Sequence, residues 1–227
     1  MKKKDDKNIS IDCVIFNYDI QGLKVLLVQE KGCDGTINWG LASECIKEGD
    51  TIENTAHRIL KKYIGLDKYF LEQLKAFGYS SNPSLQENIS IGYYALAKVE
   101  SDYLSEDYEI RDTKWCSLNE IENLSDKHTD ILSYSLKELR NKVCQSSIGF
   151  ILLPEKFTLL QVKQFYEEIL GIEMNTSNFR RKILQMGLVL DLDEKEEDVS
   201  HRAAKFYRFN AEGYQKAMQR GFNFGFF

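Results

Sequence analysis

The first two thirds of the chain alternate short apolar runs with polar turns, a pattern that is typical of β-strands. Ile11–Tyr18 and Leu23–Gln29 are rich in apolar and β-branched side chains, and the turn residues Asp19 to Gly22 between them predict a β-hairpin. Further strands are predicted at Phe77–Tyr79, Ile89–Val99 and Thr113–Cys116. We therefore expect a sheet in this part of the chain.

Two helices are predicted within the same region. Apolar residues between Thr51 and Ile64 recur at three- and four-residue steps, which is the spacing of a helix with one buried face. Asp50 or Thr51 can cap its start, and Gly65 suits the left-handed position that often follows a helix. A second helix is expected over Asp126–Val143. Strands mixed with helices predict an α+β fold.

The pattern changes near Ser146. Helices are predicted from Thr158 to Leu170 and from the cap residues Asn175–Ser177 to Gly187, followed by strands at Leu188–Leu192 and Lys205–Phe209 and a short helix at Ala211–Met218. Two helices followed by a hairpin form the order of a winged helix-turn-helix, whose second helix enters the DNA major groove. We therefore expect a flexible segment over residues 1–9, a first domain over 10–145 and a DNA-binding domain over 146–227.

The second helix of this pair carries side chains that are suited to reading DNA. Arginine recognises guanine and phosphate, and asparagine or glutamine recognises adenine. Arg202, Lys205 and Arg208 fall where the wing returns and are expected to contact phosphates. An ordinary solvated helix face is the alternative, because runs such as Arg-Arg-Lys are common on helices. The residues expected to face DNA are Ser177, Asn178, Arg180, Arg181, Lys182 and Gln185.

Composition narrows the classes of protein. Hydrophobic residues make up 43% and charged residues 29%, which is enough apolar material for packed cores and excludes a disordered chain. No apolar run approaches the roughly 20 residues of a membrane span, so no membrane partner is expected. Five scattered cysteines without a CxxC motif indicate neither a disulfide framework nor a zinc site and predict a reducing cytoplasm. The net charge of −5 argues against unspecific coating of nucleic acid.

Three segments of the last third resemble a known family. They are Leu153–Leu159 (LPEKFTL), Asn178–Ile183 (NFRRKI) and Ala203–Phe209 (AAKFYRF). They resemble the C-terminal domain of the Nudix-related transcriptional regulators, most closely the branch with arabinose-responsive sugar regulators. The resemblance implies that residues 178 and 180–182 face operator DNA, with Arg202 and Lys205 in the wing. The wing here carries a long acidic insert in place of the usual glycine-rich turn.

The same resemblance implies a Nudix-like first domain, an α/β/α sandwich around a mixed sheet. The Nudix box reads G-x5-E-x7-R-E-U-x-E-E-x-G-U, and its glutamates hold Mg²⁺ against a pyrophosphate. Asp50, Arg58, Leu60, Gly65 and Leu66 align with this frame, and Glu44 replaces the opening glycine. The other three glutamate positions hold Ile59, Lys62 and Tyr63. We therefore expect no metal, no cofactor and no catalysis; the alternative is a divergent Nudix hydrolase acting on a nucleoside-diphosphate-linked substrate.

The expected regulator binds a small effector in its first domain and reads a palindromic operator of double-stranded DNA as a homodimer. Members of the resembled family respond to ADP-ribose-like nucleotides or to sugars. Without a metal box a pyrophosphate loses its usual clamp, which favours a sugar or sugar metabolite such as L-arabinose. The effector candidates Lys31, Trp39, Glu44 and Glu87 could equally be core or solvated residues. The tail Phe222–Phe227 is predicted to pack at a subunit interface or to fray.

Overall fold

The computed structural model describes residues 9–19, 21–31, 36–65, 69–79, 88–98, 112–197 and 203–220. Glu87, Arg202 and the tail Phe222–Phe227, all singled out in the sequence, lie outside these residues. The chain divides into two compact units. The first extends to Lys137, and the second begins at Glu138 and also takes in the turn residues that precede Lys24. Each unit is described by itself.

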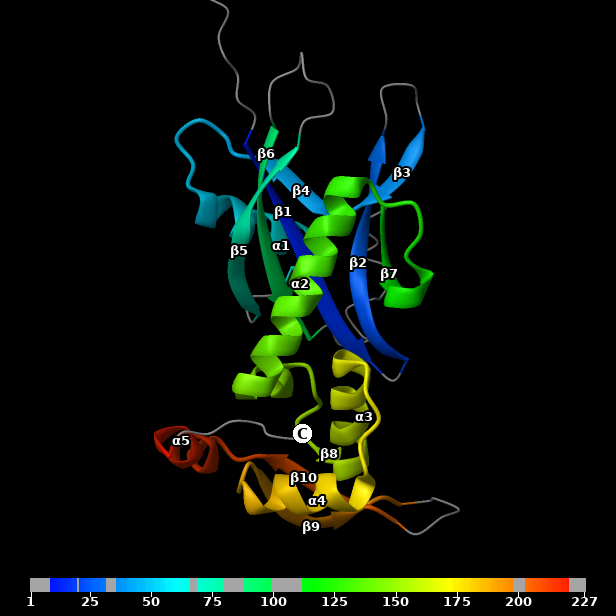
Figure 1. Cartoon of the computed structure of the whole chain (residues 1–227), viewed down its shortest axis with the longest axis vertical. Coiled ribbons are helices and arrows are strands. Elements are labelled where there is room, and N and C mark those ends of the chain that lie inside the picture. Colours follow the sequence, from blue (N-terminus) through cyan, green and yellow to red (C-terminus); the bar gives the residue numbers. More distant parts are fainter. Residues whose placement is uncertain are drawn as a thin grey trace, which may run out of the picture. The chain divides into compact units, whose positions relative to one another are not determined.

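Seven strands of the first unit form one mixed sheet among the described residues (Figure 1). The main strand order is β3-β2-β1-β6-β5, with β4 paired to β1 and β7 paired to β2. Strand β1 pairs parallel with β6 and antiparallel with β4. Strands β3 and β7 pair antiparallel with β2, and β5 pairs antiparallel with β6. The bounds are β1 Ile9–Asp19, β2 Gly22–Lys31, β3 Ile37–Gly40, β4 Ala42–Cys45, β5 Phe70–Tyr79, β6 Asn88–Leu96 and β7 Thr113–Ser117.

Strand β1 is buried on both faces because a helix covers each side of the sheet. Ile11, Cys13 and Ile15 pack in one cluster with Ile59 and Leu60 of helix α1 (Ile52–Ile64). The neighbouring positions on β1 point to the opposite face, where Asp12 bonds to residues of helix α2 (Asp126–Gln145). An almost continuous apolar strand is the expected sequence for a strand enclosed in this way. The predicted α/β/α sandwich is confirmed (Figure 1).

Strand β5 is longer than the sequence predicts. The pattern indicates only Phe77–Tyr79, whereas the strand begins at Phe70 and pairs with β6 along its length. Its first part is mostly exposed or half-buried because β5 lies at the end of the main strand order, with one neighbour. An edge strand tolerates polar residues, so the alternation that identifies half-buried strands is weak here.

Helix α1 has the caps that the sequence predicts. The hydroxyl of Thr51 accepts a hydrogen bond from the backbone N–H of Asn54 at 3.0 Å. Gly65 ends the helix with φ of 62°, in the left-handed region that favours glycine. Thr55, Ala56, Ile59 and Leu60 form its buried face. Helix α2 begins at the predicted Asp126 and continues to Gln145.

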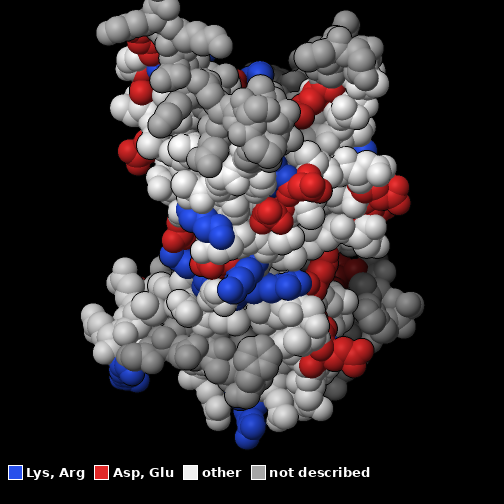
Figure 2. All heavy atoms as spheres, turned by 45° about the horizontal axis from the view of Figure 1, so that its top comes forward, with Lys and Arg blue, Asp and Glu red and all other residues white. Residues whose placement is uncertain are grey.

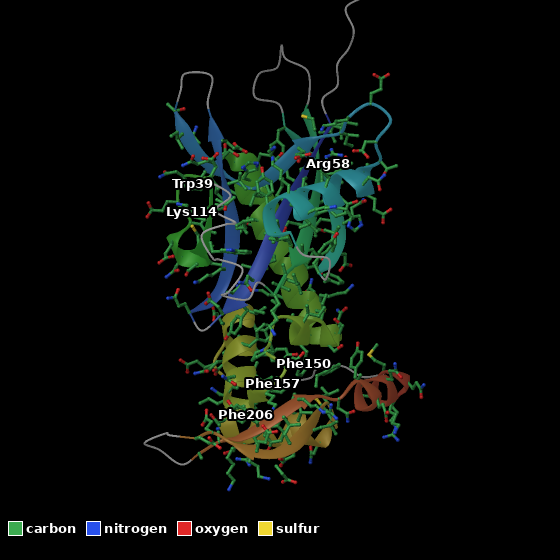
Figure 3. The ribbon with its side chains drawn as sticks, turned by 180° about the vertical axis from the view of Figure 1, so that it is seen from behind. Trp39, Arg58, Lys114, Phe150, Phe157 and Phe206 are labelled. Atoms are coloured by element: carbon green, nitrogen blue, oxygen red, sulfur yellow. The ribbon has the colours of Figure 1, made fainter. Side chains whose placement is uncertain are left out.

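The second unit has the predicted winged helix arrangement. Strand β8 leads into helices α3 and α4, and strands β9 and β10 and helix α5 follow them. The three strands form a small sheet in the order β8-β10-β9. Apolar and aromatic side chains form its core, in which the rings of Phe150 and Phe157 lie 5.7 Å apart (Figure 3). The bounds are β8 Phe157–Thr158, α3 Leu159–Leu170, α4 Thr176–Gln185, β9 Val189–Lys195, β10 Lys205–Phe209 and α5 Ala211–Gln219.

Among the described residues, 3-10 helix occurs at Leu118–Glu120 and Ser147–Ile151. Within the described part of the chain, no helix combines the length and the apolar character needed to cross a bilayer.

Candidate nucleic-acid interface and effector site

Helix α4 presents a polar face that is built from local sequence. The side chain of Asn175 caps its start by accepting a hydrogen bond from the N–H of Asn178 at 3.0 Å. Phe179 and Ile183 are buried and fix the helix on the core. Met186, the C-cap residue just beyond the helix, is half-buried. The opposite face is consequently turned towards solvent.

The structure places the predicted DNA-facing residues of α4 together on this face. Ser177, Asn178, Arg180, Arg181 and Gln185 are exposed, and Lys182 is half-buried. A guanidinium nitrogen of Arg181 lies 3.5 Å from the side-chain oxygen of Asn178, one turn earlier. Guanidinium and amide groups are therefore grouped where they could reach the edges of bases.

The wing neutralises much of its own charge. Lys205, predicted to contact phosphate, is 2.7 Å from Asp191 and 3.9 Å from Asp193 in β9. The hydrogen bond from Lys205 lowers the pKa of Asp191. Lys156 pairs in the same way with Glu194 at 2.6 Å. Lys156 and Lys205 therefore offset part of the negative charge of the acidic insert in the wing.

On the face shown in Figure 2, the basic and acidic side chains of the described residues are interspersed in small groups, with no single extended patch of either sign. An interaction with a polyanion therefore depends on local groups of cations and not on the net charge of −5.

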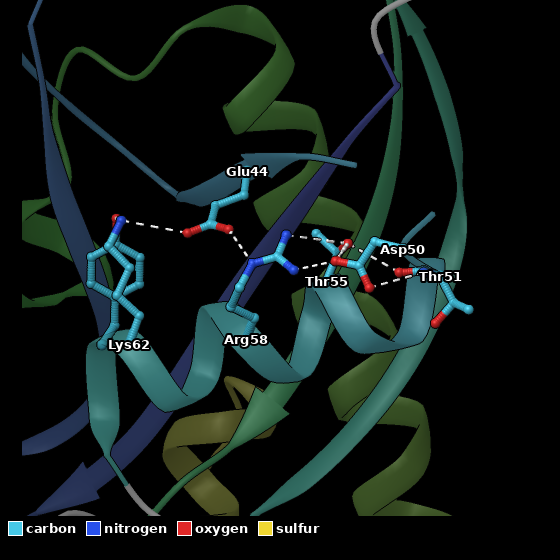
Figure 4. Close-up of polar contacts among 7 residues, drawn as sticks. Glu44, Asp50, Thr51, Thr55, Arg58 and Lys62 are labelled. Carbon is cyan, nitrogen blue, oxygen red and sulfur yellow. Dashed lines mark hydrogen bonds and ion pairs between the residues drawn. The ribbon is translucent and has the colours of Figure 1, made fainter. Parts of the chain in front are cut away.

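In the first unit, Arg58 links α1 to two carboxylates (Figure 4). Its Nε donates to Glu44 of β4 at 2.8 Å, and one of its terminal nitrogens donates to Asp50. Lys62 lies one turn further along α1, with its Nζ 3.5 Å from Glu44 and 2.9 Å from the hydroxyl of Tyr63. The bond to Arg58 lowers the pKa of Asp50, and the bond to Tyr63 raises the pKa of Lys62.

These residues do not fit a Mg²⁺ site. Glu44 and Asp50 are each bonded to a cation of α1, so neither carboxylate is available as a ligand without breaking an ion pair. Ile59 has no solvent exposure, and Tyr63 packs against the apolar cluster around it. No group of three or more potential metal ligands occurs among the described residues.

The predicted effector candidates are not all brought together. Trp39 is half-buried on β3, and Nζ of Lys114 on β7 lies 4.3 Å from the centre of its ring (Figure 3). Glu44 belongs to the ion-pair cluster described above. Lys31 is the last residue of β2, and Glu87 lies outside the described residues. Lys114 was not predicted from the sequence, because only the pairing of β2 with both β3 and β7 brings it to Trp39.

The first unit also has a hollow that was not predicted from the sequence. It has a volume of about 450 Å³ and lies where the start of α1 meets β5 and β6, with Glu53, His57, Gln73 and Tyr93 in its lining. Nδ1 of His57 lies 2.5 Å from the hydroxyl of Tyr69, and the Tyr93 hydroxyl donates to Gln73 at 2.9 Å. His57 is exposed, as its place on the helix predicts.

Asp12 is a carboxylate of the first unit that is buried without solvent exposure. Nζ of Lys127 and Nε2 of His128 lie 2.9 and 3.1 Å from one of its oxygens, and the Ser10 and Ser90 hydroxyls bond to the other. Nothing local in the sequence indicates this cluster, since Asp12 and His128 are 116 residues apart.

Comparisons with known proteins agree with both units. Residues 6–138 match the family described as NUDIX domain, and residues 149–209 match the NrtR DNA-binding winged helix domain. A protein of Acinetobacter baylyi named ADPR responsive transcriptional repressor NtrR is 26% identical over 210 residues, which cover 91% of this chain and 83% of that protein.

Solved structures show the same arrangement. Shewanella oneidensis NrtR, crystallised with a 27mer DNA, is 27% identical with a TM-score of 0.73, over 91% of this chain and 95% of that one. A MutT/nudix family protein of Enterococcus faecalis shares the fold, with a TM-score of 0.65 at 18% identity over 92% of this chain and 89% of its own. The chain therefore belongs to the NrtR-like family, in which a Nudix domain is followed by an NrtR winged helix DNA-binding domain.

Proposed function

We propose that the protein is a transcriptional regulator that binds operator DNA through α4 and the wing, and that an ADP-ribose-type nucleotide bound by its Nudix domain changes this affinity. The observation that carries the proposal is the exposed polar face of α4, with Asn178 and Arg181 in contact, inside a domain of the NrtR type. The Shewanella relative, crystallised with DNA, supports the same use of the domain here.

The effector proposal differs from the preference drawn from the sequence. The sequence reasoning favoured a sugar such as L-arabinose and placed an ADP-ribose-like nucleotide second. The Acinetobacter relative is named for its response to ADPR, which supports the nucleotide, and nothing in the comparisons supports the sugar. Lys31, Trp39, Glu44 and Glu87 remain the proposed effector residues, to which Lys114 is added because it lies over Trp39.

The Nudix domain is proposed to bind without hydrolysing. Ile59 is buried, and Lys62 brings positive charge to a glutamate position of the motif. A ligand that binds one arrangement of the protein better than another shifts the population between them, which is sufficient for regulation. The proposed protein acts in the cytoplasm as a homodimer, because a two-fold protein matches a palindromic operator.

Fluorescence anisotropy tests the DNA proposal with a labelled fragment from upstream of the gene and a scrambled duplex of equal length. We expect the native fragment to bind about 10³-fold more tightly, and salt to weaken both complexes. Asn178→Ala combined with Arg181→Ala should remove most of this preference. Lys61→Ala, an exposed lysine of α1, is the control and should leave it intact. Equal binding to both duplexes, repeated with neighbouring promoters, would overturn the proposal.

The effector is tested on the preformed complex. ADP-ribose should change the anisotropy at micromolar concentrations, and L-arabinose should not. A response to L-arabinose and none to ADP-ribose would favour a sugar as the effector. Release of AMP from ADP-ribose in the presence of Mg²⁺ would contradict the non-catalytic assignment and favour the hydrolase alternative.

A further inference from the structure

A groove of about 880 Å³ lies in the second unit at the end of α4. It is bordered by Gln185 at the end of that helix, by Leu190 and Arg208 at the base of the wing, and by one face of α5. Residues 211–219 of α5 lie beyond residue 209, where the match to the NrtR domain ends. The match to the family therefore does not extend to the side of the groove that α5 forms.

Three cations line the groove. Arg208, Lys216 and Arg220 are all exposed, and Glu212 is the acidic residue among the lining. Lys216 and Arg220 are four residues apart, so they lie side by side at the C-terminal end of α5. Among the described residues none of the three cations has a carboxylate within 4.0 Å, whereas Lys156 of the wing region has one and Lys205 has two.

Helix α5 is fastened to the turn that follows α4. The backbone N–H of Asn210 donates to Leu188 at 2.8 Å, and its side-chain amide donates to the Gly187 carbonyl at 2.8 Å. The N–H of Gly213 donates back to the Asn210 side chain at 3.1 Å. A Cβ at position 213 would lie only 2.0 Å from the Gly187 carbonyl oxygen, so glycine permits this close approach. The cations are therefore held in a fixed place relative to α4.

We propose that this groove binds the phosphate backbone of the duplex that α4 reads, with Arg208, Lys216 and Arg220 as the phosphate contacts. The inference rests on the proposed DNA-binding function. A ten-residue helix such as α4 is about 15 Å long, and the major groove of B-DNA is about 12 Å wide. The ends of α4 then reach the backbones that border the groove, and Gln185 belongs both to its exposed face and to the cationic groove. Phosphates complement unpaired arginine and lysine side chains.

The test compares Lys216→Gln/Arg220→Gln with the native protein on the native and scrambled duplexes over a range of salt. Each lost phosphate contact lowers the slope of log affinity against log salt by about 0.9, so the double variant should lose about 2. At 0.15 M salt the affinity for both duplexes should fall roughly thirtyfold, with the preference between them unchanged. Arg208→Gln alone should lower the slope by about 1 and tests the groove independently of α5.

The matched control is Lys47→Gln/Lys61→Gln, which removes the same charge from exposed lysines of the first unit and should leave the slope unchanged. An unchanged slope in the groove variants, with native melting temperature and native preference, would overturn the inference and leave the proposed function standing. A loss confined to the native duplex would also overturn it, because phosphate contacts do not read sequence. Failure of the unaltered protein to bind either duplex would remove both proposals.

Discussion

Nε2 of His128 lies 3.1 Å from Oδ1 of Asp12, and the other imidazole nitrogen, Nδ1, accepts a hydrogen bond from the backbone N–H of Leu41 at 3.3 Å. The Leu41 bond assigns the proton of the ring to Nε2, so His128 donates to Asp12. One imidazole thereby joins strand β1, the start of helix α2 and the segment between β3 and β4.

This cluster makes the first unit sensitive to acid. Burial alone would raise the pKa of Asp12, but the hydrogen bond from His128 and the charge and hydrogen bond of Lys127 outweigh it and lower the pKa to about 2. Because the pKa of Asp12 is lower in the folded protein than the 3.8 of the unfolded chain, its ionised carboxylate stabilises the fold at pH values above 3.8. This contribution is lost as the pH falls towards 2. The difference corresponds to about 2 kcal/mol.

Urea unfolding at pH 7, 5 and 3 measures this contribution. Tryptophan fluorescence is the signal, because Trp39 and Trp115 both lie in the first unit. Asp12→Asn should be less stable at pH 7 and should lose about 1 kcal/mol less than the native protein between pH 7 and pH 3, where about half of the contribution has gone. Asp130→Asn, an exposed carboxylate of the same helix as His128, is the control. Equal losses in all three proteins would contradict the prediction.

Restoring a glutamate of the motif should unfold the protein before it binds metal. Ile59→Glu introduces a carboxylate at a fully buried position and should destabilise the first unit by about 3 kcal/mol or more. Lys62→Glu changes a side chain that is 51% exposed and should stay within about 1 kcal/mol. Urea unfolding with and without Mg²⁺ gives both values. A stable Ile59→Glu variant whose melting temperature rises with Mg²⁺ would contradict this prediction, because it would show that the site can still bind the metal.

Position 213 should not accept a side chain. Gly213→Ala pushes a methyl group against the Gly187 carbonyl, which is backbone and cannot swing away, so α5 must shift. We expect faster hydrogen exchange in α5 and a loss of about 2 kcal/mol in the second unit. Gly78→Ala, which meets nothing within 4 Å, should be near neutral. Similar behaviour of the two variants would mean that α5 is not held as described.

Trp39 should matter to a nucleotide more than to a sugar. Lys114 holds a cation against its ring, and a base stacked on an aromatic side chain gains about 1–3 kcal/mol. Trp39→Ala should therefore weaken ADP-ribose binding at least about tenfold in calorimetry. Ile37→Ala removes an exposed side chain from the same strand and serves as the control. Unchanged affinity in the Trp39 variant would move the effector elsewhere, with the hollow beside His57 as the next place to test.

Sequence reasoning succeeded where the determinants are local. Helix α3 follows Thr158 and ends at Leu170 as predicted, because the capping side chain of Thr158 and the left-handed Gly171 act within one turn of the helix. The winged helix order follows from such signals, and so does the exposed face of α4.

Features that depend on distant residues were not predicted. The first part of β5 is polar and is held by pairing with β6. Strand β9 extends through the acidic residues to Lys195, and Lys156 and Lys205 offset their charge. The contacts of Lys114 with Trp39 and of Asp12 with His128 arise only when strands and helices far apart in the chain come together.

The parallel pairing of β1 with β6 also determines when the sheet of the first unit can form during synthesis. Ile9 lies opposite Ile89, so strand β1 cannot complete its hydrogen bonds until about eighty further residues have been made. Pairing of strands so far apart in the sequence is slow, because the intervening chain loses conformational entropy before the stabilising contacts form. Contacts in the second unit, such as β9 with β10, are much shorter in sequence. The winged helix should therefore fold quickly once made, while the sheet of the first unit should set the overall folding rate.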